Sequence, residues 1–198
     1  MTTVASSQIV EWCRQAAERG FSDSQYNLGV IYSEGDGVEP DENEATKWFL
    51  KAAEQGHAEA QFTLGLMHAA DKNAEPNYGQ AFRWFGAAAK QGHPGAQFKL
   101  GVLYADGRGV DKNDREAAVW FRRAAERGLA KARGALGYMY AAGRGVPRDS
   151  VQAFLWLNSV AIQGNVRARK MRDGLAESMS REEIARAQAL SRRWTPTS

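Results

Sequence analysis

Five tryptophans recur every 36 residues, and this period constrains the fold more than any other feature of the chain. Five glycines and four Leu-Gly pairs share the period. The recurring positions are Trp12, Trp48, Trp84, Trp120 and Trp156, then Gly20, Gly56, Gly92, Gly128 and Gly164, and the pairs that begin at Leu28, Leu64, Leu100 and Leu136. Three residue types do not share one period by chance. The sequence therefore predicts a protein built from repeated supersecondary units.

Each repeat predicts two helices joined by a turn. In the first helix, Ala60, Leu64 and His68 are spaced four residues apart and share one face. The glycine after each leucine costs helix stability, so we expect it to allow close packing of two helices. The turns carry paired glycines, which permit the positive φ that ends a helix. In the second repeat Asp71 and Asn73 replace these glycines, so this turn is the irregular one.

The second helix opens with an acceptor residue followed three positions later by Glu or Gln, which predicts a reciprocal capping box. The four pairs are Asp41/Glu44, Asn77/Gln80, Asn113/Glu116 and Asp149/Gln152. The tryptophan follows in register with Phe49 and its equivalents. We therefore expect the tryptophans to form the core between helices and not a stacking platform for nucleic-acid bases.

The combined pattern A-x-x-x-L-G-x-x-Y, G-x-G-V, A-x-x-W-F-x-x-A-A-x-x-G resembles the Sel1-like repeat, a 36-residue relative of the tetratricopeptide repeat. The best copy comprises Ala96, Leu100, Gly101, Tyr104, Gly107, Gly109, Val110, Ala117, Trp120, Phe121, Ala124, Ala125 and Gly128. The resemblance implies an all-α fold, a right-handed α-solenoid of stacked antiparallel helix pairs with about eleven helices. We expect residues 1–198 to form one solenoid domain. Its segments are a half repeat at 7–20, full repeats at 21–56, 57–92, 93–128 and 129–164, and a degenerate helix plus a capping helix at 165–194.

The last helix is predicted to close the stack. Ser180 and Glu183 form another capping box, and an apolar stripe follows at Ile184, Ala187 and Leu190, with Trp194 beyond. A terminal repeat needs a polar outer face, which the charged remainder of this helix supplies. The alternative is that this basic helix binds a partner or a membrane surface.

The residues that catalysis or metal binding would need are sparse. The chain has one cysteine and three histidines, and no two histidines have helical ligand spacing. Cys13 is expected to be a buried small side chain, His57 and His93 exposed turn residues, and His68 a packed ring. No Ser-x-x-Lys or phosphate-loop motif occurs. We therefore expect a non-enzymatic protein without cofactor or metal.

The chain carries no apolar segment long enough to span a membrane and no secretory leader. We therefore expect a cytoplasmic protein, with a monomer as the default oligomeric state.

The two halves of the chain differ in net charge. Residues 1–92 hold seven basic and thirteen acidic residues, and residues 93–198 hold nineteen basic and ten acidic residues. A solvated surface without a binding role and the attraction of an acidic partner to the basic half are both open explanations, and the interleaved aromatics that would favour nucleic acid are missing.

In tetratricopeptide-like stacks the first helices line the concave face and bind extended peptides or helices. Residues that vary between copies on these helices are therefore our candidates for binding a protein or peptide partner. They are Gln25, Asn27, Gln61, Thr63, Gln97, Lys99, Arg133, Tyr138 and Arg169. By the same resemblance, Asn27, Lys99 and Arg133 suit a backbone carbonyl or carboxylate. Gly134 leaves a gap where Tyr26, Phe62 and Phe98 carry rings.

These observations predict a protein-binding adaptor or regulator. Two alternatives stay open. One is a dedicated inhibitor or immunity-type protein that binds a single partner stoichiometrically. The other is a small-molecule-binding or catalytic module, which would need a deep pocket.

Overall fold

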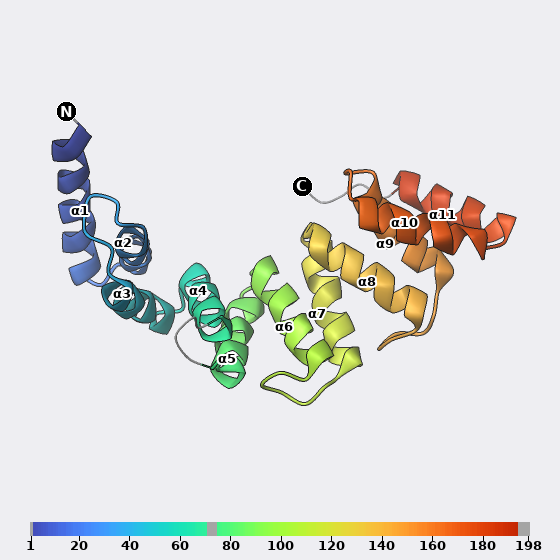
Figure 1. Cartoon of the computed structure of the whole chain (residues 1–198), viewed down its shortest axis with the longest axis horizontal. Coiled ribbons are helices and arrows are strands. Elements are labelled where there is room, and N and C mark those ends of the chain that lie inside the picture. Colours follow the sequence, from blue (N-terminus) through green and yellow to red (C-terminus); the bar gives the residue numbers. More distant parts are fainter. Residues whose placement is uncertain (1, 71–74, 194–198) are drawn as a thin grey trace. The chain divides into compact units, whose positions relative to one another are not determined.

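The computed structural model describes the backbone of residues 2–70 and 75–193, and the side chains of residues 8–70 and 75–192. Within these ranges the chain forms eleven helices and no strands, as predicted (Figure 1). The helices are α1 (Thr2–Glu18), α2 (Ser22–Glu34), α3 (Glu42–Glu54), α4 (Ala58–Ala69), α5 (Tyr78–Lys90), α6 (Pro94–Asp106), α7 (Asp114–Glu126), α8 (Ala130–Ala142), α9 (Ser150–Ala161), α10 (Val166–Glu177) and α11 (Arg181–Arg193).

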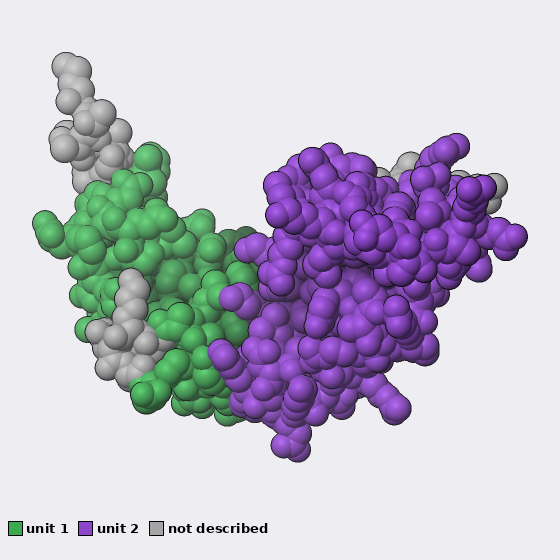
Figure 2. All heavy atoms as spheres, turned by 45° about the vertical axis from the view of Figure 1, so that its right-hand side comes forward, with its two compact units in different colours: residues 1–93 green, residues 94–198 purple. Residues whose placement is uncertain are grey.

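The chain divides into two compact units, residues 1–93 and residues 94–198 (Figure 2). Unit 1 holds α1 to α5 and unit 2 holds α6 to α11. Within each unit the main packing joins the first and second helix of one repeat: α2 with α3 and α4 with α5 in unit 1, α6 with α7 and α8 with α9 in unit 2. Each 36-residue repeat is therefore one helical hairpin.

The Leu-Gly pairs set how closely the two helices of a repeat approach. A Cβ atom placed on Gly65 would lie 2.5 Å from the ring of Phe85, and one on Gly101 would lie 2.7 Å from the ring of Phe121. The neighbouring leucines are buried, with Leu64 1% exposed. The glycine therefore makes room for the large side chain of the second helix, which confirms the packing role predicted for it.

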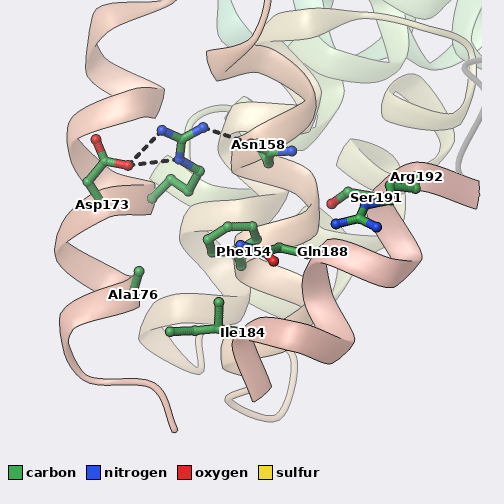
Figure 3. A pocket seen from close by; sticks show the side chains of 9 residues that line it. Phe154, Asn158, Asp173, Ala176, Ile184, Gln188, Ser191 and Arg192 are labelled. Atoms are coloured by element: carbon green, nitrogen blue, oxygen red, sulfur yellow. Dashed lines mark hydrogen bonds and ion pairs between the residues drawn. The ribbon is translucent and has the colours of Figure 1, made fainter. Parts of the chain in front are cut away.

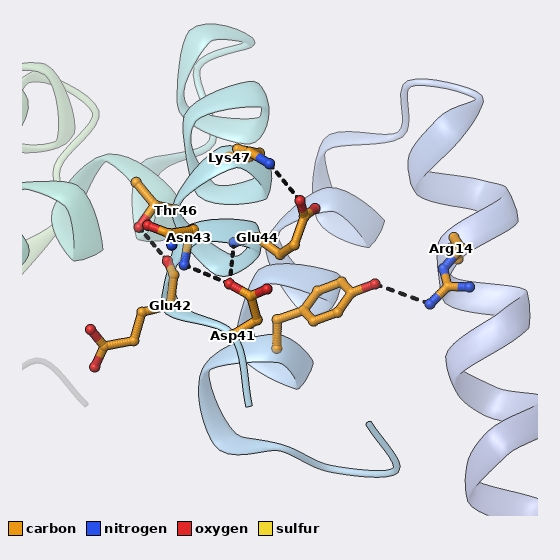
Figure 4. A network of polar contacts seen from close by, with 8 residues as sticks. Arg14, Asp41, Glu42, Asn43, Glu44, Thr46 and Lys47 are labelled. Atoms are coloured by element: carbon orange, nitrogen blue, oxygen red, sulfur yellow. Dashed lines mark hydrogen bonds and ion pairs between the residues drawn. The ribbon is translucent and has the colours of Figure 1, made fainter. Parts of the chain in front are cut away.

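The second helices are capped by Asp or Asn, but the predicted reciprocal box is wrong for Asp41 and Glu44. Asp41 Oδ1 accepts from the backbone N–H groups of Asn43 and Glu44 at 2.9 and 3.0 Å (Figure 4). The Asp41 N–H donates to the carbonyl of Tyr32 instead, at 2.9 Å. The Glu44 carboxylate pairs with Lys47. Because the first helix already binds the capping N–H, Glu44 has no orphan donor to satisfy.

The same backbone bond joins the helices of the other full repeats. The N–H groups of Asn77, Asn113 and Asp149 donate to the carbonyls of His68, Tyr104 and Tyr140. A reciprocal box does form at Ser180, where no such carbonyl is used. The Ser180 N–H donates to Glu183 Oε2 at 2.8 Å and the Glu183 N–H donates to Ser180 Oγ at 3.2 Å.

Some of the repeated tryptophans lie in the core, and Trp12 lies at the surface. Trp48 and Trp156 are buried, and Trp84 and Trp120 are half-buried. Trp12 is 68% exposed, so the prediction of a core role is wrong there. Trp48 packs against Leu28 of its own first helix and Ala17 of the preceding second helix. In the described part of the chain no first helix precedes α1, so Trp12 has no such neighbours.

The C-terminal helix packs on the preceding helices of unit 2. α11 packs on α9, and Ala187 is fully buried. Ile184 and Leu190 pack against a buried cluster that includes Phe154 and Met179. Trp194, and the turn residues Asp71 and Asn73, lie outside the described residues.

Candidate partner-binding site

Four of the predicted binding residues recur at one position of the repeat and form a polar ladder inside the protein. Gln25, Gln61, Gln97 and Arg133 are 5%, 7%, 4% and 2% exposed. Gln25 Nε2 donates to the carbonyl of Ala17 at 3.1 Å, and Gln61 Nε2 donates to that of Ala53 at 3.0 Å. Each acceptor lies eight residues earlier, near the end of the preceding second helix. These side chains therefore join one repeat to the next.

Other side chains extend this arrangement. Gln55 Nε2 donates to Gln25 Oε1 at 2.6 Å, and Gln91 Nε2 donates to Gln61 Oε1 at 2.8 Å. Arg133 keeps the same link, with Nε 3.2 Å from the carbonyl of Ala125, and burial lowers the pKa of its guanidinium. Buried groups engaged in these bonds are not displayed to a partner.

The histidines at the repeat boundaries pack against aromatic rings, and His57 also caps a helix. His57 Nδ1 accepts from the backbone N–H of Ala60 at 3.1 Å, and its ring stacks on Tyr26 with centroids 4.8 Å apart. His93 stacks on Phe62 at 4.4 Å. Their side chains are 16% and 11% exposed, so the prediction of exposed turn residues is wrong. An aromatic ring on the preceding first helix covers each imidazole.

Thr63 lines a groove that lies along two of the first helices. This groove in unit 1 has a volume of about 710 Å³ and is formed by α2, the start of α3, and α4. Its apolar wall includes Val30, Phe49 and Met67, and its polar wall includes Ser33 and Asn43. Met67 is 36% exposed. We name this the α2–α4 groove.

Tyr138 lines a second groove, in unit 2, which has a volume of about 340 Å³ and is formed by α8, α9 and α10. Tyr138 is 46% exposed. The full lining is Ala130, Lys131, Gly134, Ala135, Tyr138, Leu157, Val160, Asn165, Arg167, Ala168 and Met171. We name this the α8–α10 groove.

The remaining predicted residues are dispersed. Asn27 is exposed and lines a hollow of about 570 Å³ between α1 and α2, beside Trp12. Lys99 is half-buried on α6 and Arg169 is exposed on α10. Thr63 and Asn27 belong to unit 1, whereas Lys99, Tyr138 and Arg169 belong to unit 2. The predicted set therefore does not form one site within either unit.

Sequence reasoning missed Lys131, Asn165 and Arg167 as lining residues of the α8–α10 groove. The signal that could have found them is the loss of large side chains at equivalent positions. Gly134 stands where the other repeats carry a ring, and Asn165 stands where the first two boundaries carry a histidine.

A further pocket, of about 550 Å³, lies between α9, α10 and α11 (Figure 3). Arg172 occupies the position of the repeated leucine in α10. Its Nη1 donates to Asn158 Oδ1 at 2.7 Å, and its Nη2 lies 2.7 Å from Asp173 Oδ1. The bond to Asn158 joins α10 to α9 where the other repeats have the apolar leucine, whereas the contact with Asp173 lies within α10.

Among the residues that the structure describes, no group of three or more His, Cys, Asp or Glu side chains is placed to hold a metal ion. None of the described helices is both long and apolar enough to cross a membrane.

Comparisons with known proteins agree with this architecture. A model of the Sel1 repeat matches residues 10–21, 22–57, 58–93, 94–129 and 130–165, one residue later than the predicted boundaries of the full repeats. Comparison with curated proteins gave no match.

Two solved structures have folds similar to that of this chain. A protective antigen of uropathogenic Escherichia coli that displays an SLR fold is 38% identical, with a TM-score of 0.82 over 93% of this chain and 40% of its own. A Sel1 repeat protein from Oxalobacter formigenes is 35% identical, with a TM-score of 0.79 over 86% of this chain and 50% of its own. The chain thus spans half or less of the length of these two proteins.

A more distant structure, Helicobacter pylori cysteine rich protein B, is 23% identical, with a TM-score of 0.51 over 65% of this chain and 92% of its own. It shares the fold. Sel1 repeat proteins in general mediate protein–protein interactions and are non-enzymatic. Because the family model covers most of the sequence, and the helix pairs and Leu-Gly packing agree with it, the chain belongs to the Sel1 repeat family.

Proposed function

We propose that this chain is a non-catalytic protein-interaction module, which binds a segment of a partner protein along its first helices. The observation that carries the proposal is that the α2–α4 groove in unit 1 and the α8–α10 groove in unit 2 both run along first helices. Both combine an apolar floor with polar groups at the rim, the composition that protein interfaces use. The general role of the family in protein–protein interaction supports the same conclusion.

Side-chain burial separates binding residues from structural ones. The ladder at positions 25, 61, 97 and 133 is buried, whereas Met67 and Tyr138 are exposed in the grooves. Tyrosine is enriched at binding hot spots because its ring buries a large area and its hydroxyl still forms hydrogen bonds. We therefore assign partner contact to Thr63 and Met67 in the α2–α4 groove, and to Lys131 and Tyr138 in the α8–α10 groove.

The test is affinity capture from a lysate of the source organism, followed by mass spectrometry. Wild type is compared with Thr63→Arg/Met67→Glu and with Lys131→Glu/Tyr138→Ala. The matched control is Val119→Glu, because Val119 is 43% exposed on α7, a second helix. Circular dichroism first establishes that all four proteins are equally helical.

We expect a protein that wild type and the control retain and that at least one groove variant loses. Equal retention by all four proteins, or retention of nothing by wild type, would contradict the proposal. The stoichiometry of the retained complex separates the modes of action. Several partners indicate an adaptor, and a single tight partner at one-to-one ratio indicates a dedicated inhibitor or immunity-type protein.

A further inference from the structure

The first helices of the first three full repeats each carry an aromatic ring that packs on the second helix. The ring centroids of Tyr26 and Phe49 lie 5.7 Å apart, and those of Phe62 and Phe85 lie 5.8 Å apart. In the third repeat the ring centroids of Phe98 and Phe121 lie 5.5 Å apart. At the first two boundaries the same ring also stacks on the histidine that precedes the next first helix. These positions form a ring cluster in each of the first two repeats.

The fourth repeat has no ring at any of the three equivalent positions. Gly134 replaces the ring of the first helix, Leu157 replaces the phenylalanine of the second helix, and Asn165 replaces the capping histidine. Asn165 keeps the capping role, with Oδ1 2.9 Å from the backbone nitrogen of Ala168. The capping function is therefore preserved while the aromatic volume is lost.

All three replacements line the α8–α10 groove. A Cβ atom placed on Gly134 would meet no other atom within 4 Å, although equivalent positions in the earlier repeats hold a whole ring. The floor beneath it is apolar, since Leu157 and Val160 are 1% and 3% exposed. The groove is thus an apolar space at the place where this fold elsewhere holds an aromatic side chain.

The rim of the groove is basic. Lys131 and Arg167 are exposed, and none of the described residues that line the groove is acidic. Residues 93–198 carry nineteen basic and ten acidic residues. A positive rim attracts a negatively charged partner and fixes its register, while an apolar anchor in the floor provides most of the affinity.

We propose that the α8–α10 groove binds an acidic segment of a partner protein and takes one aromatic side chain of that segment into the space at Gly134. The bound ring replaces the ring that Tyr26, Phe62 and Phe98 provide in the earlier repeats. The carboxylates that flank it pair with Lys131 and Arg167. This inference rests on the proposed function, since it specifies the chemistry of the partner at one of its two grooves.

The test uses a phage-displayed library of random 12-residue peptides, selected on the full chain. We expect selected peptides to carry a Phe, Tyr or Trp among Asp and Glu residues. Replacing that aromatic by alanine should weaken binding roughly 30-fold, as expected for a buried anchor. Added salt should weaken binding further, because the rim charges are exposed.

The decisive variant is Gly134→Phe, which restores the ring of the other repeats and fills the groove from within. It should bind the selected peptides at least about 30-fold more weakly than wild type. Gly174→Phe is the matched control, because Gly174 also lies in a helix of unit 2, its Cβ would also meet no atom within 4 Å, and it is not part of the groove lining. This control should bind as wild type does.

Selection of no peptide, selection of peptides without an aromatic or with basic flanks, or equal binding by Gly134→Phe and wild type would each overturn the inference. The proposed function is tested independently of this inference. If Gly134→Phe still retains a partner that Thr63→Arg/Met67→Glu loses, the chain binds its partner through the α2–α4 groove, and only the inference about the α8–α10 groove falls.

Discussion

Two helical glycines show how differently the same residue type acts in this molecule. Gly65 faces the ring of Phe85, and a Cβ atom there would lie 2.5 Å from it, whereas the space at Gly134 is open. Gly65→Ala should therefore lower the free energy of unfolding by about 1–3 kcal/mol through overpacking. Gly134→Ala should raise it by about 0.5–1 kcal/mol, because alanine favours the helix. Urea denaturation of both variants checks the opposite signs.

A destabilising effect of Gly134→Ala would mean that the backbone at this position is closer to a neighbour than the structure shows. A neutral Gly65→Ala would mean that α4 and α5 can separate without cost. The first result would contradict the open space at Gly134, and the second would contradict the account of Leu-Gly packing.

The buried glutamines are the clearest case of polar residues that hold the fold. Gln61 donates to the carbonyl of Ala53 and accepts from Gln91. Gln61→Ala leaves a buried carbonyl without this donor, so thermal or urea unfolding should show a loss of about 1–3 kcal/mol. Gln91 is exposed, and Gln91→Ala should cost less than about 1 kcal/mol. A loss for Gln61→Ala no larger than that for Gln91→Ala would count against a structural ladder.

Sequence reasoning placed these glutamines on a binding surface, although one signal pointed inward. Gln61 precedes the buried Leu64 by three residues, a spacing that places both on one helical face. Variation among copies favoured a partner role, yet the change from Gln97 to Arg133 occurs at a position that is buried in both repeats. A repeat position can vary in residue type while its structural task stays the same.

The positions of the helix ends were predictable from the sequence, but only some of the hydrogen bonds at those ends were. Asp41 caps α3 as its sequence spacing indicates, but the bond from its N–H to the carbonyl of Tyr32 joins two helices. Local sequence patterns describe one helix end, so they do not reveal a tertiary acceptor. The cap at Ser180 followed the local rule, because Ser180 and Glu183 bond each other.

An ion pair links the last two full repeats and makes stability depend on pH. Arg144 Nη2 lies 2.8 Å from Asp114 Oδ1, and its hydrogen bond holds the pKa of Asp114 below its ordinary value. A depressed pKa in the folded state stabilises the fold above the unfolded pKa of about 3.9, and this gain is lost as the pH falls through the folded pKa.

Asp114→Asn should therefore lower the free energy of unfolding by less than about 1 kcal/mol at pH 7, since the pair is partly exposed. The difference from wild type should shrink as the pH falls below about 4. Chemical denaturation across this range checks it, with Glu39→Gln, an exposed carboxylate in unit 1, as the charge control. A difference that stays constant down to pH 2 would exclude the ion pair as its source.

At the scale of the whole molecule, the 36-residue period predicted the helix pairs and their order. It did not predict that Trp12 is exposed, because periodicity assigns each copy the same neighbours. It also did not predict the grooves, which depend on differences between copies. Gly134 was recognised as a gap from the sequence, but its meaning came from Leu157 and Asn165, which the fold brings to the same groove.

Charge is also distributed at this scale. Residues 1–92 are acidic on balance and residues 93–198 are basic on balance, a division that nearly coincides with the two units. The α8–α10 groove lies in the basic unit, so the charge of the unit and of the groove rim favour the same kind of partner.

The central claim, that the first helices bind the partner, is tested most directly by hydrogen–deuterium exchange of the full chain with and without the captured protein. We expect exchange to slow in α2 and α4, or in α8 and α10, the first helices that line the two grooves. Slowing confined to the second helices α5 and α7, with the first helices unchanged, would contradict the account.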